Sequence, residues 1–352
     1  MEQNTLRRRG VCLTGVDKQR SFGGYTLFCP LTSDTAHLVD IHGSDHSWKL
    51  HGRVGRHARI LPNGNHAVNT LRPPVKHTTA DGGPFPFPFF NKYGGDIMSE
   101  LDTDGNVYHY GDGRILFTAL EALSREDSAK VLGGVPGTLI DVITYVDTIR
   151  EAHYTREHYP LVNSVLPLRD GNILASLRSV SAVIIIERCT GDIVWRLGPE
   201  VLAQQHNATE LAKGNILIFD NGAFRSGESI TYTRAIEVDR ASRSIVWEYR
   251  HRSQMLNLFT PFMGSAQRLA NGNTLLCESA FGRLFEVTRD GYICWEYVSP
   301  YFAAYPDGVT AKMFPGESNA LFRAYRYSLD EVAWLKQKLI ASEGPKPSCV
   351  VM

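Results

Sequence analysis

The chain has 352 residues and a hydrophobic content of 43%, which is enough to bury a large core in one domain. Its 37 lysines and arginines balance 37 aspartates and glutamates, so no excess of positive charge points to a nucleic-acid partner. No apolar run is long enough to span a bilayer, and the basic start of the chain has no apolar segment behind it. We expect a cytoplasmic protein whose partner is a small molecule or a protein.

Short apolar strands that follow glycine turns recur along the chain. The turn glycines are Gly64, Gly113, Gly171, Gly214 and Gly272, which are 49, 58, 43 and 58 residues apart. This spacing is close to the period of propeller blades with variable insertions. Within each unit, hairpin turns lead to an aromatic strand, and helical periodicity is nearly absent. The sequence therefore predicts an all-β fold.

An N-terminal unit at residues 24–48 brings the number of predicted units to six. A closed ring completes its last blade with strands from both chain ends, and residues 24–28 are suited to pair with residues 321–327. Trp195 and Trp247 fall at equivalent points of successive units, which favours packing between neighbouring blades over a ligand role. We expect a six-bladed β-propeller.

The propeller is expected to span residues 20–327, after an N-terminal extension at residues 1–19. Ser328 and Glu331 form a capping-box pattern, which predicts a short C-terminal helix. Residues 328–352 are therefore expected to form this helix and a flexible tail.

The six cysteines form no Cys-x-x-Cys pair, and we expect free thiols. Cys349 stands apart because the chain ends Cys-Val-Val-Met, which fits the C-a-a-X prenylation pattern, although a coincidental tail is the alternative. A single prenyl chain would give reversible membrane attachment. No set of residues has the spacing of metal ligands, so no metal-binding residues are assigned, and the use of a metal stays open.

One polar strand entry stands out in the fifth unit. Residues 204–222 begin with a polar run around His206, continue as an apolar strand and stop at Asp220-Asn221-Gly222. Taken alone, His206 is interpreted as the cap of a turn, and Arg178 as the partner of a blade carboxylate.

Ordered segments along the chain carry a family resemblance. They include GYTLF, RHARILPNGN, GGDIMSELDTDGNVYHY, NSVLPLRDGNILASLRSVSAVIIIERCTGDIVWRLGPE, QQHNATELAKGNILIFDNG, GSAQRLANGNTLLCESAFGRLFEVTRDGYICWEY and FRAYRY. Over roughly residues 20–327, the chain resembles the arylsulfotransferase family of six-bladed propellers. The resemblance implies transfer of a sulfuryl group from an aryl sulfate to a phenol, without a nucleotide or other cofactor.

The resemblance also implies roles for two residues. His206 would project into the central channel and take up the sulfuryl group, because a neutral imidazole is a nucleophile at physiological pH and a covalent intermediate divides the transfer into two displacements. Arg178, in the Ser-x-Arg strand of the preceding blade, would bind sulfate oxygens and stabilise charge in the transition state.

Further residues are candidates for substrate binding, namely His57, Asn163, Gln205, Arg268, Glu278 and Arg283. His57 enters its strand before Gly64 much as His206 does before Gly214, so it is either channel-facing or a buried structural histidine. Glu278 would either orient a ligand or neutralise an arginine.

Two departures from the family pattern favour a different function. Leu161 stands where the family has a histidine, and leucine can neither donate a proton nor bind an oxyanion. The third unit, around Gly113, has little room for the family's His-His-Asp strand entry, for which His109 is an approximate substitute. The alternative is a catalytically altered or inactive propeller that binds a small molecule or a protein. A different reaction in the same channel, such as hydrolysis or elimination, also stays open.

Overall fold

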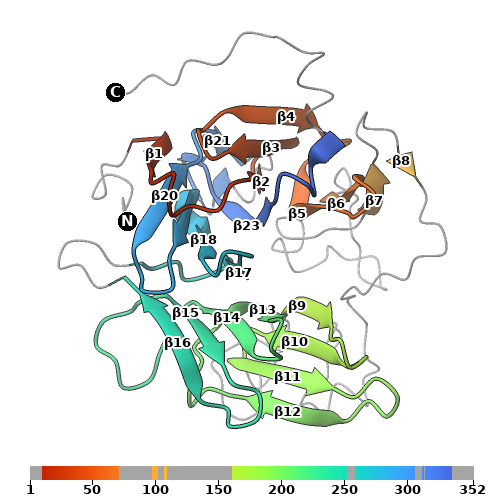
Figure 1. Cartoon of the computed structure of the whole chain (residues 1–352), viewed down its shortest axis with the longest axis vertical. Coiled ribbons are helices and arrows are strands. Elements are labelled where there is room, and N and C mark those ends of the chain that lie inside the picture. The colour runs from red at the N-terminus through yellow and green to blue at the C-terminus, as the bar shows by residue number, and fades with distance from the viewer. Residues whose placement is uncertain are drawn as a thin grey trace. The chain divides into compact units, whose positions relative to one another are not determined.

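The computed structural model describes residues 10–70, 97–101, 107–108, 161–251, 258–305, 311–312 and 314–334. Almost all regular structure in these residues is β-strand (Figure 1). The chain folds as two compact units: the first comprises Met1–Gly113 with Met263–Met352, and the second comprises Arg114–Phe262.

The second unit contains two four-stranded antiparallel sheets. One consists of β9 (Val162–Pro167), β10 (Ile173–Leu177), β11 (Ala182–Ile186) and β12 (Ile193–Leu197). The other consists of β13 (His206–Glu210), β14 (Ile216–Asp220), β15 (Arg234–Val238) and β16 (Ile245–Arg250). Consecutive strands pair in chain order, which is the topology of a propeller blade.

The first unit contains three larger sheets and one small one. The first sheet has the order β23 (Leu321–Tyr327), β2 (Tyr25–Pro30), β3 (Thr35–Asp40), β4 (Asp45–Lys49). The second has the order β5 (Val54–Ile60), β6 (His66–Thr70), β7 (Ile97–Leu101), β8 (Val107–Tyr108). The third has the order β1 (Cys12–Val16), β20 (Ile293–Val298), β19 (Arg283–Val287), β18 (Thr274–Glu278), β17 (Ser265–Arg268), and a 3-10 turn, η2 (Ser279–Phe281), joins β18 to β19. The small sheet pairs β21 (Ala303–Ala304) with β22 (Glu317–Ser318).

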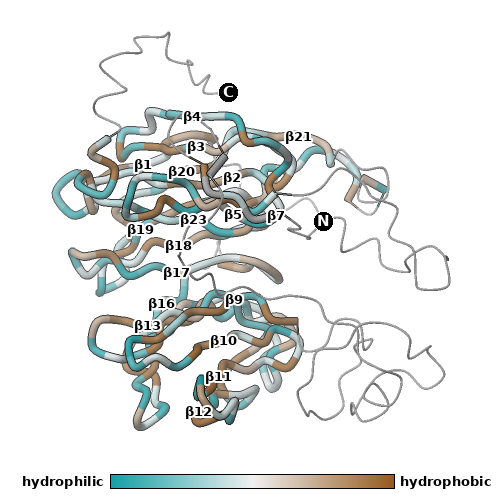
Figure 2. The backbone as a smooth tube through the Cα atoms, turned by 90° about the vertical axis from the view of Figure 1, so that its right-hand side faces the viewer, coloured by the Kyte–Doolittle hydropathy of each residue, from teal (hydrophilic) through white to brown (hydrophobic). Residues whose placement is uncertain are grey.

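These sheets confirm the predicted all-β propeller fold, with five blades in the described residues where the sequence predicts six. The remaining predicted unit, around Gly113, falls within residues 109–160, which lie outside the described part of the chain. The turn signals are placed as expected, because φ is 87° at Gly171, 91° at Gly214 and 89° at Gly272, a range that favours glycine. Hydrophilic turns alternate with apolar strands along the backbone (Figure 2).

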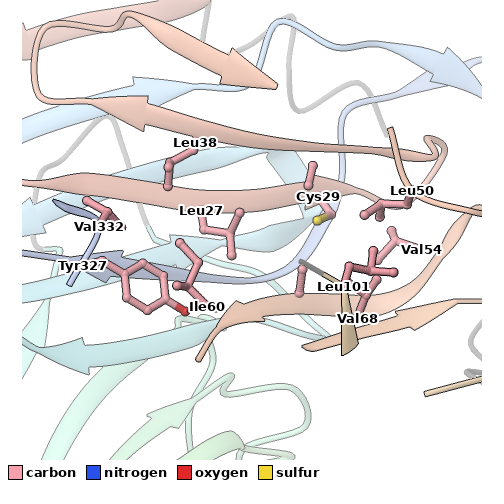
Figure 3. Packing of buried hydrophobic residues seen from close by; sticks show 12 residues of the cluster. Leu27, Cys29, Leu38, Leu50, Val54, Ile60, Val68, Leu101, Tyr327 and Val332 are labelled. Carbon is pink, nitrogen blue, oxygen red and sulfur yellow. Dashed lines mark hydrogen bonds between the residues drawn. The ribbon is translucent and has the colours of Figure 1, made fainter. Parts of the chain in front are cut away.

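The predicted pairing of the two chain ends is also confirmed. β2 and β23 are antiparallel, with Tyr25 opposite Tyr327 and Phe28 opposite Ala324. Side chains from this sheet and from β5 pack into one cluster, in which Leu27, Ile60 and Tyr327 lie close together (Figure 3). The Tyr327 hydroxyl accepts a hydrogen bond of 2.9 Å from the backbone N–H of Ile60, so the polar end of this buried ring is satisfied.

The capping box is present, since the Ser328 N–H donates to Glu331 Oε2 (2.7 Å) and the Glu331 N–H donates to Ser328 Oγ (3.3 Å). The rest of the predicted helix, and Cys349, lie outside the described residues.

The expectation of free thiols holds for Cys29, Cys189, Cys277 and Cys294. It is wrong for Cys12, which is disulfide-bonded. Within the described ranges, no helix has the length and apolar character needed to cross a membrane, and no group of potential ligands has the arrangement of a metal site.

Candidate active site

His206 is the first residue of β13 and is only 4% exposed. The pairing of β13 with β14 shifts register between His206 and Ala208, and the intervening Asn207 has a φ of 49°. This is a β-bulge with an asparagine in the left-handed region, which tolerates asparagine better than most residues. A bulge re-aims side chains at a strand end, so it determines the direction in which the imidazole leaves the strand.

A buried network holds the imidazole. His206 Nδ1 lies 2.8 Å from Asn221 Oδ1, and Asn221 Nδ2 donates to the Thr260 carbonyl oxygen at 2.8 Å. The Thr233 hydroxyl donates to the Asn221 carbonyl oxygen (2.8 Å) and accepts from the Thr260 N–H (2.9 Å). Asn221, Thr233 and Thr260 are fully buried. We refer to these four residues as the His206 network.

Gln205 and Asn163 hold the strand entry in place. The buried Gln205 amide nitrogen lies within hydrogen-bond distance of Ser176 Oγ (3.0 Å), the Leu177 carbonyl oxygen (3.2 Å) and the Ala182 carbonyl oxygen (2.8 Å). Asn163 Nδ2 donates to the Gln205 carbonyl oxygen at 2.7 Å. These contacts bind the backbone just before His206 to the neighbouring blade.

Arg178 lies in the tight turn between β10 and β11, one residue beyond the strand in which the resemblance places it. Its backbone N–H donates to the Leu161 carbonyl oxygen at 3.0 Å. Because Gln205 contacts the carbonyl of Leu177, the residue before His206 is tied to the residue before Arg178. The structure therefore brings Asn163, Arg178, Gln205 and His206 to one end of two neighbouring blades in the second unit.

Leu161 lies at the same end, directly before β9, and has a φ of 54°. Left-handed backbone is unusual for leucine and costs on the order of 1–2 kcal/mol. Gln204, before β13, and Met263, before β17, have φ values of 52° and 61°. Since three strand entries share this conformation, we attribute the strain to the way these blades begin.

The predicted residues of the first unit are engaged in structural contacts. Arg283 Nη1 donates to Glu278 Oε2 at 3.1 Å, and Arg283 Nε donates to Glu296. Glu278 thus neutralises an arginine, which is one of the two roles expected for it. Arg268 Nη1 donates to the Gly272 carbonyl oxygen at 3.0 Å. His57 lies in β5, and its side chain is outside what the structure describes.

Sequence reasoning missed the function of the Asp220-Asn221-Gly222 turn, although the motif was visible at the end of the strand. Asp220 Oδ1 accepts from the Ala203 N–H at 2.9 Å, and Oδ2 accepts from Arg225 and Arg234, each at 2.8 Å. Burial is the largest single influence and would lower the pKa of Arg234, but the charge and hydrogen bond of Asp220, together with the charge of Glu248, outweigh it and raise the pKa above its usual value. This ion cluster anchors the segment that leads into His206.

A comparison of the sequence with models of protein families gives a match over part of the chain. Residues 142–300 match the family model described as arylsulfotransferase (ASST). Over that segment, the chain resembles the arylsulfotransferase family. The match includes β9 to β20 and so contains the whole His206 network. A comparison with curated proteins gives no match.

Solved structures resemble this chain at low sequence identity. A protein of unknown function from Bacteroides caccae shares 12% identity with a TM-score of 0.45, over 87% of this chain and 99% of that chain. A streptogramin B lyase shares 12% identity with a TM-score of 0.38, over 85% and 86%. The β-propeller domain of Cps50 (Swd1) from Myceliophteria thermophila shares 12% identity with a TM-score of 0.39, over 82% and 90%.

Proposed function

We propose that the chain is an arylsulfotransferase-type enzyme that moves a sulfuryl group from an aryl sulfate to a phenol, with His206 as the nucleophile and no nucleotide cofactor. The observation that carries this proposal is the anchored imidazole. His206 lies at a bulged strand entry within the segment that matches the family, and a buried amide holds one of its ring nitrogens. A nucleophile needs this kind of orientation, which an ordinary turn cap does not.

The transfer takes two displacements. In the first, an imidazole nitrogen attacks sulfur, an N–S bond forms, and the bond from sulfur to the aryl oxygen breaks. The aryloxide leaves with the electron pair of that bond and takes a proton from solvent. In the second, the phenol oxygen attacks sulfur and releases its proton to solvent, while the electron pair of the N–S bond returns to the imidazole.

Arg178 is the proposed anion-binding residue of the second unit. A guanidinium is charged at every physiological pH, and its planar donors match sulfate oxygens, whose negative charge increases as the S–O bond breaks. Gln205 and Asn163 support the reaction through the strand entry that they hold. His57 remains the candidate in the first unit, whereas the contacts of Arg268, Glu278 and Arg283 favour structural roles.

The test is release of nitrophenolate from p-nitrophenyl sulfate in the presence of a phenol. We expect the wild-type chain to release it and His206→Ala to abolish the release. The buried His66 of β6 provides a matched control. We expect folded His66→Ala protein to release nitrophenolate at the wild-type rate per molecule. Incubation with donor alone should add the mass of one sulfuryl group to the wild-type chain and not to His206→Ala. Turnover that survives His206→Ala would refute the assigned nucleophile.

A binding protein is the second candidate, and the observation that favours it is Leu161, whose carbonyl oxygen accepts a hydrogen bond from the Arg178 N–H. If the missing histidine limits the chemistry, Leu161→His should raise the rate of nitrophenolate release, because an imidazole there can donate a proton or bind an oxyanion. Steady-state rates of nitrophenolate release by the wild-type chain and by Leu161→His test this expectation. Calorimetric binding of an aryl sulfate, with no turnover by either protein over a panel of donors and acceptors, would instead support the binding module.

A further inference from the structure

The contacts of Asn221 determine which nitrogen of His206 carries a proton. The Thr260 carbonyl oxygen can only accept, so the side-chain group of Asn221 that faces it at 2.8 Å must be the amide nitrogen. The amide oxygen is then the atom that lies 2.8 Å from His206 Nδ1. The opposite orientation of the amide would place two acceptors against each other. Nδ1 is therefore the donor in the contact with Asn221.

We propose that Asn221 is a positioning residue, which holds the neutral His206 imidazole in the tautomer with its proton on Nδ1, so that Nε2 is the nitrogen that bonds to sulfur. This inference rests on the proposed function and makes it more specific. In a neutral imidazole, protonation of Nδ1 leaves the lone pair on Nε2. Only that nitrogen can attack without a prior proton shift.

The network is built to keep this orientation. Asn221 is fully buried, and the Thr233 hydroxyl connects its carbonyl to the N–H of Thr260. Asn221, whose side chain contacts His206, and Thr260, which orients that side chain, are thus held together through Thr233. Rotation of the amide would replace its two favourable contacts, with His206 and with the Thr260 carbonyl oxygen, by contacts between like groups.

The same contact strengthens as the reaction proceeds. When Nε2 bonds to sulfur, the imidazole ring becomes cationic and Nδ1–H becomes a stronger donor. Hydrogen bonds from a charged donor are roughly twice as strong as those between neutral groups. Asn221 therefore stabilises the sulfuryl intermediate more than the free imidazole, which is the condition for a contact to contribute to the rate.

Nitrogen NMR tests the tautomer without any need for turnover. The full-length chain is labelled with 15N-histidine, and His206→Gln identifies the signals of His206 among the 12 histidines. At neutral pH, we expect a protonated Nδ1 and an unprotonated Nε2. Asn221→Leu removes the acceptor for Nδ1 and should give a mixture of tautomers. A wild-type chain with the proton on Nε2, or a tautomer unchanged in Asn221→Leu, would overturn the proposal.

Kinetics supply the second readout. Asn221→Leu should lower kcat/KM by roughly 10- to 100-fold, by analogy with the loss when a partner that orients a metal-binding histidine is removed.

The matched control is Asn215→Leu, which removes an amide hydrogen bond of 2.8 Å to Glu237 at the other end of the same sheet. It should change neither the tautomer nor kcat/KM. Equal losses in Asn215→Leu and Asn221→Leu would mean that the effect is structural, and would overturn the positioning role. A chain without turnover, but with the expected NMR pattern, would refute the proposed reaction and leave the tautomer assignment standing.

Discussion

Three consecutive residues at the end of β14, Asp220, Asn221 and Gly222, have different tasks at the candidate site. Asp220 binds the segment before β13, and Asn221 binds the imidazole. Gly222 permits a close approach, because its N–H donates to the Ala203 carbonyl oxygen at 2.9 Å and a Cβ there would lie 1.7 Å from the Tyr232 carbonyl oxygen. The geometry around His206 therefore depends on a turn that is not itself reactive.

Gly222→Ala should destabilise the chain by several kcal/mol, because it combines a φ of 77° with this backbone clash. The matched control is Gly214→Ala. Gly214 has a φ of 91°, but a Cβ there would meet no atom within 4 Å, so only the backbone cost of about 1–2 kcal/mol is expected. Chemical denaturation measures both. Equal losses would show that the close approach to Tyr232 has no energetic weight.

The candidate site was only partly predictable at this scale. His206 and Arg178 were identified through the family resemblance, and the structure places both at one end of neighbouring blades. Asn221 was missed because an Asn-Gly pair after an apolar strand is also the ordinary signal of a turn. Its contact with His206 joins residues 15 positions apart across a β-bulge, and a bulge changes which side chains meet without leaving a clear trace in the sequence.

At the scale of strands and turns, the sequence was more informative. Recurring turn glycines predicted the hairpins, and the tryptophans of successive units were expected to pack between blades. Trp195 of β12 does reach the next blade, where its indole N–H donates to the Arg240 carbonyl oxygen at 2.7 Å. What the pattern could not show is which polar side chains join the blades, since those contacts depend on the distance between two sheets.

One such contact is the ion pair between Asp170, in the turn before β10, and Arg240, in the turn after β15, at 2.8 Å. The hydrogen bond from Arg240 is the main reason why the pKa of Asp170 lies below its usual value, and a hydrogen bond from the Asn172 N–H adds to it. A lowered carboxyl pKa stabilises the folded chain above the pKa of the unfolded chain. This contribution is lost as the pH falls through the folded pKa.

Asp170→Asn should therefore lower the free energy of unfolding at pH 7 and have less effect in acid, where the wild-type carboxyl is also neutral. Because both side chains are partly exposed and the pair is screened, the expected loss is at most about 1 kcal/mol. Denaturation of both proteins at pH 7 and near pH 3 measures it. A difference that grows toward low pH would contradict the assigned sign.

At the scale of the whole molecule, the pairing of β23 with β2 joins segments from opposite ends of the sequence. A chain that ends at residue 320 lacks β23, so it should lose cooperative unfolding and expose the unpaired edge of β2. A chain that ends at residue 327 keeps the strand and loses only the packing of later residues such as Val332. Circular dichroism during heating, together with light scattering, compares the two. Cooperative melting of the shorter chain would show that the closing strand is dispensable.

This pairing also has a consequence for biosynthesis. β2 leaves the ribosome almost 300 residues before β23, which begins at Leu321. At translation rates of 5–20 residues per second, roughly 15–60 s pass before the partner strand exists. During that interval the edge of β2 has no partner strand, and an unpaired edge can associate with other polypeptides. We therefore expect the yield of folded protein to depend more on chaperones that bind the nascent chain than on the stability of the folded state.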